Sequence, residues 1–230
     1  MTNTSVLNFT LPAWQTHDPG LWLKFWASLY ESTTSRREDN RVYYTRIGRA
    51  GKLAAEDFET VGRWKEGCLA ENHGSWKPNT PAAYEVWMRA KDKRPTCPPD
   101  SSIPDFLTEW SDIEFTAGVS KKTQKVLKKR FGLSRSTALL HFVSGGRFPI
   151  FDSRVRKAIK RLGSSPPTDP TVKWYLDTFC QLCKEMADLC GVSGTRGLRL
   201  LDNALFCYGG GTKISLVMID KAVLLGKSNS

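Results

Sequence analysis

Apolar residues in this sequence recur at helical spacing, and helix-start signals precede them. After Asp18-Pro19, a capping residue with a proline in the first turn, large side chains return every three or four positions. These side chains are Trp22, Phe25, Trp26 and Leu29. The pair Thr80-Pro81 repeats the signal before Tyr84, Trp87 and Met88. The spacing predicts helices that pack an aromatic stripe into a core.

Most of the remaining chain also has a helical pattern. The predicted helices are Ile103–Trp110, Lys121–Arg130, Ser136–Val143, Ser153–Leu162, Thr171–Cys190 and Gly197–Tyr208. Two segments differ: Lys91–Ile103 is rich in proline and charge and predicts an exposed connection, and Tyr43–Gly48 is either a short strand or a loop. The chain has 230 residues and is 40% hydrophobic, enough for one large domain or two small ones. We therefore expect an all-α fold with at most a minor strand element.

The positive charge of the chain is concentrated in one segment. The whole chain has 34 basic and 23 acidic side chains, a net charge of +11. Val119–Arg161 holds thirteen of the basic side chains and one acid, Asp152, so the rest of the chain is close to neutral. An unbalanced basic segment indicates a polyanionic partner, although charge runs also occur on solvated helix faces.

Several classes of protein are not indicated. The first residues, Met1–Trp14, lack the basic and apolar regions of a signal peptide, and no stretch has the roughly 20 apolar residues of a membrane span. The basic segment lacks the aromatic face of a membrane-surface helix, which favours nucleic acid over lipid. We expect an intracellular protein, in the cytoplasm or nucleoid, or in the nucleus if eukaryotic, whose six cysteines are free thiols.

A predicted turn lies at the centre of the basic segment, in Leu127–Phe142, LKKRFGLSRSTALLHF. Gly132 tolerates the backbone angles of a tight turn, and Ser134 is a favourable N-cap for the helix that follows. The N–H groups of such a helix start suit a phosphate oxygen. Lys128, Lys129 and Arg135 would then contact neighbouring phosphates without reading sequence. The alternative is an ordinary turn between two helices with glycine as the C-cap.

Two stretches of the chain resemble the helix-hairpin-helix DNA glycosylases, the superfamily of endonuclease III and 8-oxoguanine glycosylase. They are Phe131–Ala138, FGLSRSTA, and Phe148–Val155, FPIFDSRV. The family has a hairpin of the type LPGVGxxTA, an apolar helix, and a VDxxVxR element, in that order. The resemblance covers roughly Ser120–Gly210, including a later helix at Leu200–Gly209, and implies two helical subdomains with a DNA-binding helix-hairpin-helix and a cleft between them.

The resemblance implies a domain organisation and a set of site residues. Residues 1–100 would form a helical region that contributes to the core and the second subdomain, 101–215 the glycosylase-like region with its hairpin near 121–143, and 216–230 a tail. The implied DNA contacts are Lys128, Lys129, Gly132, Ser134, Arg135, Ser136, Thr137 and Arg154. The partner would be double-stranded DNA, and the protein a monomer.

The chain departs from the family pattern at three positions. Phe131 replaces a proline and Ser134 replaces the second glycine of the hairpin. Ser136 stands where bifunctional members have the catalytic lysine, so no Schiff base forms there. The resemblance therefore implies a monofunctional glycosylase, which hydrolyses the N-glycosidic bond of a flipped, damaged or mismatched base and leaves the strand intact.

Asp152 is the carboxylate that the family comparison assigns to catalysis. A fixed carboxylate stabilises the positive charge that develops on the sugar and orients or activates a water. The same residue precedes Ser153–Arg161, where aspartate is a favoured N-cap. The two roles are compatible, because capping would hold the carboxylate in place.

No metal or cofactor is expected. Cys180, Cys183, Cys190 and Cys207 have the wrong spacing for the iron–sulfur cluster of some family members and are expected to be buried core residues. His17 and His73 have no partners at metal-binding spacing, and His141 is expected to pack in the core. Two alternatives to the enzyme stay open: a non-catalytic DNA-binding protein with the same fold, and an RNA-directed or structural protein.

Overall fold

The computed structural model describes residues 18–33, 47–66, 86–88, 90–119 and 123–210, and these are mostly helical. The predicted helical character is thus confirmed. Within these ranges the strands form one two-stranded antiparallel ribbon, which the all-α prediction did not place. Contacts group the chain into two compact units, Met1–Thr34 with Gly146–Ser230 (unit 1) and Ser35–Gly145 (unit 2).

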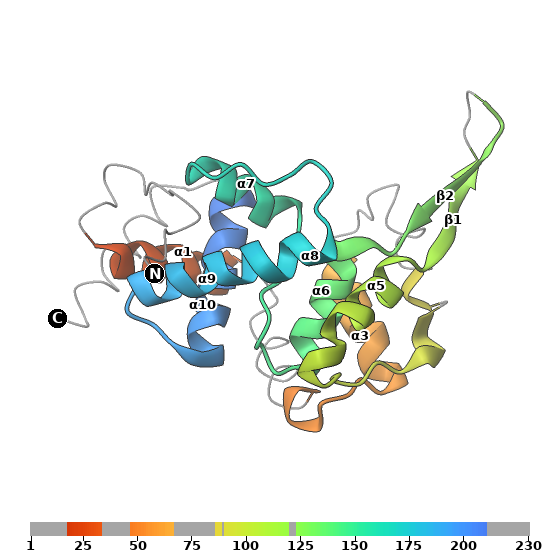
Figure 1. The fold of residues 1–230 in the computed structure, drawn as a ribbon, viewed down its shortest axis with the longest axis horizontal. Coiled ribbons are helices and arrows are strands. Elements are labelled where there is room, and N and C mark those ends of the chain that lie inside the picture. Colours follow the sequence, from red (N-terminus) through yellow and green to blue (C-terminus); the bar gives the residue numbers. More distant parts are fainter. Residues whose placement is uncertain (1–17, 34–46, 67–85, 89, 120–122, 211–230) are drawn as a thin grey trace. The chain divides into compact units, whose positions relative to one another are not determined.

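Unit 1 is built around its last described helix. Helix α10 (Gly194–Gly210) packs against α1 (Pro19–Thr33), α7 (Ser153–Arg161) and α9 (Cys180–Leu189) (Figure 1). A short α8 (Val172–Trp174) and a π-helical turn η4 (Tyr175–Phe179) lead directly into α9, so the long helix predicted over Thr171–Cys190 contains one widened turn.

Local signals set the helix boundaries of unit 1. The Asp18 carboxylate accepts a hydrogen bond from the Leu21 backbone N–H at 2.9 Å, which confirms the cap predicted at the start of α1. The aromatic stripe of α1 then faces α10, where Trp22 and Trp26 contact the Tyr208 ring edge to face, at centroid distances of 5.7 and 5.0 Å.

Close packing of α7 on α10 depends on one glycine. A Cβ atom on Gly209 would lie 1.8 Å from the carbonyl oxygen of Arg154, closer than any real contact. Only a residue without a side chain fits there, so Gly209 sets the distance between the two helices.

Unit 2 is organised around α6 (Gly132–Val143), whose residues from Ser136 to Val143 are all buried. Helices α5 (Ile103–Ser111) and α3 (Ala55–Glu66) pack against it. Short 3₁₀ turns, η2 (Lys91–Lys93) and η3 (Asp100–Ser102), lie in the connection before α5. Four rings, those of Phe58, Trp87, Trp110 and Phe131, form an aromatic cluster with centroid distances of 4.9 to 6.0 Å.

The helix predicted over Lys121–Arg130 is wrong. Its described part contains strand β2 (Val126–Arg130), which pairs antiparallel with β1 (Glu114–Val119). Partners run from Glu114 opposite Arg130 to Val119 opposite Val126, with an irregularity between Thr116 and Val119. Lysine favours helices only weakly, and pairing with a strand rich in β-branched and aromatic residues outweighs that preference.

Other expected elements fall partly outside the described residues. The Thr80-Pro81 helix start and Tyr84 lie there, as do residues 43–46 of the possible strand at Tyr43–Gly48; Ile47 and Gly48 are helical. No described helix has the length and apolar character to cross a membrane.

Candidate functional site

Asp152 lies at the N-terminus of α7, in extended backbone with φ −133° and ψ −177°. Its Oδ1 accepts hydrogen bonds from the backbone N–H groups of Arg154 at 2.9 Å and Val155 at 3.0 Å. These bonds satisfy two donors at the helix start and fix the orientation of the carboxylate. The predicted capping role is confirmed, and the side chain remains partly exposed to solvent.

The loop before Asp152 is held by two buried side chains from other parts of unit 1. The Tyr175 hydroxyl donates a hydrogen bond to the Pro149 carbonyl oxygen at 2.7 Å. The Ile150 backbone N–H donates to Asp202 Oδ1 at 3.2 Å. Tyr175 comes from η4 and Asp202 from α10, so elements distant in sequence fix adjacent peptide groups.

Asp202 is itself paired. Arg199, one turn earlier on α10, donates from Nη1 to Asp202 Oδ2 at 2.6 Å, and the two side chains are only 12% and 7% exposed. A buried carboxylate without a cationic partner would be costly, and this ion pair provides such a partner while Oδ1 accepts the Ile150 N–H.

The next residue of the loop, Phe151, is fixed by rings. It is buried and contacts Trp174 and Phe179 at centroid distances of 5.2 and 4.9 Å. Residues 149, 150 and 151 are therefore each held by a different contact immediately before Asp152. The π-helical turn supplies two of the partners, Tyr175 and Phe179, and such turns are frequent at functional sites.

Burial sets the protonation of the groups behind the loop. It raises the pKa of the Tyr175 hydroxyl well above its ordinary value, so the group stays a hydrogen-bond donor. It also raises the pKa of the Cys180 thiol to about 12 and that of Cys190 to about 11, and it raises the pKa of Cys183 strongly. These cysteines remain protonated thiols at neutral pH, a state that suits neither nucleophile nor metal ligand.

Of the four cysteines expected to be buried core residues, Cys183, Cys190 and Cys207 are buried, whereas Cys180 is only partly buried. Among the described residues, no three His, Cys, Asp or Glu side chains lie close enough to hold a metal ion. His141 also packs in the core, as predicted, with its ring against Phe142 at 5.8 Å.

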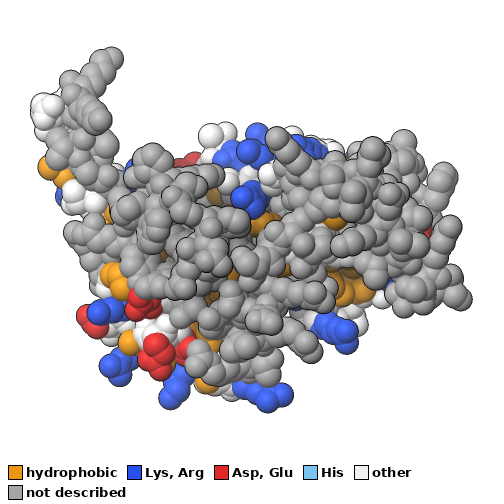
Figure 2. Space-filling model, turned by 180° about the vertical axis from the view of Figure 1, so that it is seen from behind, with side chains coloured by type: hydrophobic (Ala, Val, Ile, Leu, Met, Phe, Trp, Pro, Cys, Tyr) orange, Lys and Arg blue, Asp and Glu red, His pale blue; other side chains and the backbone are white. Residues whose placement is uncertain are grey.

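Helix α7 has one apolar and one basic face. Val155, Ala158 and Ile159 are buried against the unit, whereas Arg154, Lys157, Lys160 and Arg161 are exposed. Arg154 lies over the Phe206 ring at 4.3 Å, and Arg161 donates to the Tyr208 carbonyl oxygen. Within the described part of the chain, none of these four side chains forms an ion pair with a carboxylate. Figure 2 shows Lys and Arg side chains of the described residues at the surface.

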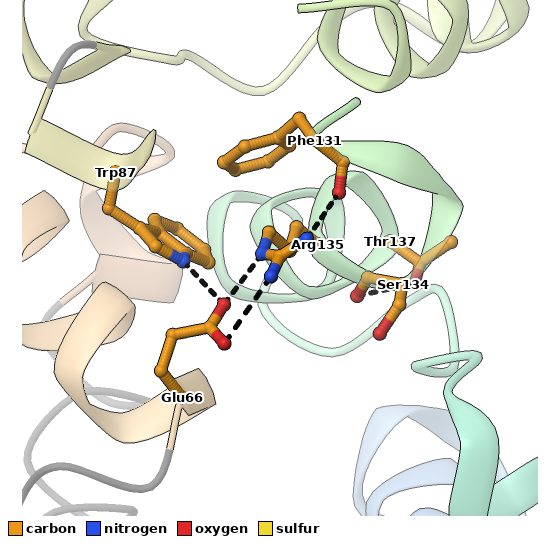
Figure 3. A network of polar contacts seen from close by, with 6 residues as sticks. All are labelled: Glu66, Trp87, Phe131, Ser134, Arg135 and Thr137. Carbon is orange, nitrogen blue, oxygen red and sulfur yellow. Dashed lines mark hydrogen bonds and ion pairs between the residues drawn. The ribbon is translucent and has the colours of Figure 1, made fainter. Parts of the chain in front are cut away.

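Arg135 does not serve as the exposed phosphate contact that the sequence predicts. Its Nε and Nη2 donate to the two oxygens of Glu66 at 2.6 and 3.4 Å, and its Nη1 donates to the Phe131 carbonyl at 3.0 Å (Figure 3). The Trp87 indole N–H also donates to Glu66, at 2.9 Å. With 21% exposure, the Arg135 side chain joins α6 to α3 instead of facing solvent.

Ser136 and Thr137 are also turned into unit 2. Both are fully buried, and the Ser136 hydroxyl contacts the Ser111 hydroxyl at 2.7 Å. Thr137 Oγ1 donates to the Ser134 carbonyl at 3.3 Å (Figure 3). Helix α6 places both side chains in the core of unit 2 and not at the helix start.

The turn itself agrees with the prediction in one residue and differs in another. Gly132 has a φ of +76°, the left-handed conformation that glycine was expected to provide. Ser134 is not the N-cap, because α6 begins two residues earlier and Phe131 precedes it. The element before the turn is a strand, so the described structure has a strand-turn-helix where a helix-hairpin-helix was expected.

Lys128 and Lys129 are exposed on β2. Lys128 lies 3.7 Å from Glu114 across the ribbon, in a pair that is more than half exposed on both sides. Both lysines thus remain accessible to a partner, but on a strand and not on a helix.

The structure therefore joins Asp152 and Arg154 in unit 1, whereas the remaining predicted contacts belong to unit 2. The sequence did not point to Tyr175, Asp202 or Arg199. Asp202 was the most detectable, because it is a lone acid within the apolar run LLDNALF. Comparison of the chain with family models, curated proteins and solved structures found no match in any of the three.

Proposed function

We propose that the protein is a monofunctional DNA glycosylase whose catalytic carboxylate is Asp152. The fixed position of that carboxylate supports the proposal most. Its orientation is set by two backbone N–H groups, and the loop before it is anchored at three consecutive residues. A preorganised negative charge is what an oxocarbenium-like transition state requires, because no reorganisation is needed as the charge develops.

In the proposed reaction, the target base leaves the stack and the bond between its nitrogen and the anomeric carbon breaks. The base departs with the electron pair of that bond, and the Asp152 carboxylate stabilises the cationic sugar. A water attacks the anomeric carbon and gives up a proton to the Asp152 carboxylate, and the departed base takes up a proton from solvent, which leaves an abasic site and an intact strand. Ser136 supplies no amine and is buried, so this chain offers no Schiff base at that position.

The exposed basic face of α7 supports DNA as the partner. Arg154, Lys157, Lys160 and Arg161 follow Asp152 on the same helix, and phosphate contacts of this kind position a duplex without reading its sequence. Arg154, two residues after Asp152 in the sequence, has its guanidinium held over the Phe206 ring.

The test is a single-turnover assay on duplexes with a panel of damaged and mismatched bases. Asp152→Asn is the key variant, because asparagine is an equally good N-cap and keeps α7 intact. Asp169→Asn removes an exposed carboxylate from the same unit and is the matched control. We expect alkali-labile abasic sites with the wild type and the control, and a rate at least about 100-fold lower with Asp152→Asn. Unchanged excision by Asp152→Asn would remove this residue from the mechanism.

A second candidate is a DNA-binding protein without catalysis. The inward orientation of Arg135, Ser136 and Thr137 favours it, because the segment that most resembles the glycosylases lacks the expected contacts. This alternative predicts salt-dependent duplex binding and no abasic product from any base in the panel.

A further inference from the structure

The ribbon formed by β1 and β2 is the most basic part of unit 2. Residues 114–130 carry six basic side chains and one acid. The described basic side chains, Lys125, Lys128, Lys129 and Arg130, are all exposed. In Figure 1 the two strands extend away from helices α5 and α6 of their own unit. Most of the ribbon therefore faces solvent and not the core.

The root of the ribbon is fixed to that core. The Phe131 N–H donates to the Ile113 carbonyl at 2.8 Å, and Phe115 is buried. The Arg135 guanidinium lies 5.9 Å from the Phe115 ring and 6.0 Å from the Phe131 ring, and Glu66 holds it in place. Arg135 thus contacts both strands at the base of the ribbon, near the start of β1 and directly after the end of β2. These contacts fix the direction in which the exposed part extends.

The ion pairs along the ribbon leave its charge accessible. Lys128 with Glu114 and Arg130 with Asp112 are exposed pairs at 3.7 and 3.2 Å, and pairs of this kind are weak and readily exchanged. Lys129 has no carboxylate partner among the described residues. A phosphate could replace the carboxylates at small cost.

One face of β2 combines charge with an exposed apolar side chain. Every second side chain of a strand lies on the same face, and on one face of β2 these are Val126, Lys128 and Arg130. Val126 is 57% exposed. A short two-stranded ribbon is marginally stable alone, so a partner that covers this face would add to its stability.

We infer that this ribbon is a second DNA-binding element, which lies in the major groove of a duplex with Lys128, Lys129 and Arg130 on the flanking phosphates. The inference rests on the proposed function in taking duplex DNA as the partner. The major groove admits a two-stranded ribbon, and the charge of the ribbon complements the phosphates that line it. The ribbon would give unit 2, which does not contain Asp152, a DNA contact of its own.

The experiment measures duplex affinity of the full chain over a range of salt concentrations. The test variant is Lys128→Gln/Lys129→Gln, and Lys52→Gln/Lys91→Gln is a control with the same charge change at exposed sites of unit 2. We expect the test variant to bind roughly tenfold more weakly near 0.1 M salt, with the slope of log K against log salt reduced by about two. Lys128→Arg/Lys129→Arg should restore both values, which a loss of folding would not allow.

Equal affinity of the test and control variants would overturn the inference. Preferential binding of single-stranded RNA or of anionic phosphatidylserine vesicles over duplex DNA would overturn the choice of partner. Failure of the proposed function has a different result. A wild type that makes no abasic product would contradict the glycosylase proposal, but its duplex affinity would still show whether the ribbon lysines bind DNA.

Discussion

The Asp202 carboxylate accepts the backbone N–H of Ile150 at 3.2 Å, although 52 residues separate them in the sequence. This bond ties the middle of the last described helix to the loop that ends at Asp152. Together with the hydrogen bond from the Tyr175 hydroxyl to Pro149, it makes this buried loop a fixed support for one carboxylate. Variants that remove such contacts should have measurable effects on stability and activity.

Tyr175→Phe should lower the free energy of unfolding by about 1–2 kcal/mol, because it leaves the buried Pro149 carbonyl without its donor. If Asp152 acts in excision, kcat should fall more than KM rises, since the loop positions the carboxylate and does not bind DNA. Urea denaturation and steady-state kinetics measure the two effects. Tyr208→Phe removes another hydroxyl of unit 1 as the control, and equal effects of the two variants would contradict a special role for Tyr175.

Asp202→Ala should destabilise the protein by about 3 kcal/mol, because it removes the buried carboxylate that pairs with Arg199 and accepts the Ile150 N–H. Chemical denaturation provides the measurement. Asp177→Ala breaks an exposed pair with Lys173 in the same unit and should change the stability very little. A similar small loss for both would mean that the Asp202 pair is not buried in solution.

Gly209→Ala should separate α7 from α10, because its Cβ would meet the Arg154 carbonyl at 1.8 Å. We expect a loss of roughly 3 kcal/mol or failure to fold. At the neighbouring position, Gly210→Ala meets only the Arg154 side chain, which can move, so it should fold. Thermal unfolding of the two variants compares them, and equal melting temperatures would refute the close packing.

Arg135→Gln should lower stability by roughly 2 kcal/mol through loss of the charged hydrogen bonds to Glu66. The salt dependence of DNA binding should not change, because the guanidinium is paired with Glu66 and its side chain is only 21% exposed. Denaturation and a salt titration test both statements. A salt slope reduced by about one would instead return Arg135 to the DNA-binding surface.

The buried thiols should make the stability fall at high pH. Burial raises the pKa of Cys180 from 9.0 to about 12, so the folded chain keeps a proton that the unfolded chain releases. Stability from this group is complete below pH 9 and is lost as the pH rises from 9 toward 12. Cys180→Ala should therefore reduce the loss of stability between pH 8 and pH 10.5, measured by denaturation at each pH. An unchanged loss would show that other groups cause it.

Local signals in the sequence were sufficient for the features that depend on neighbouring residues. The cap at Asp18, the cap at Asp152 and the left-handed glycine at position 132 each follow from backbone groups within three residues. The helical spacing of apolar residues likewise indicated α1, α5, α7 and α10. Both the existence of these elements and the position of the candidate carboxylate could be predicted.

The tertiary structure decided the features that depend on distant partners. Val126–Arg130 became a strand because Glu114–Val119 pairs with it. Arg135 turned inward because Glu66, which also accepts the Trp87 indole N–H, pairs with it there. The same holds for Tyr175 and Asp202, whose partners Pro149 and Ile150 lie 26 and 52 residues away. A sequence pattern reports periodicity and local capping, whereas the exposure of a charge or hydroxyl is determined only when remote segments pack against it.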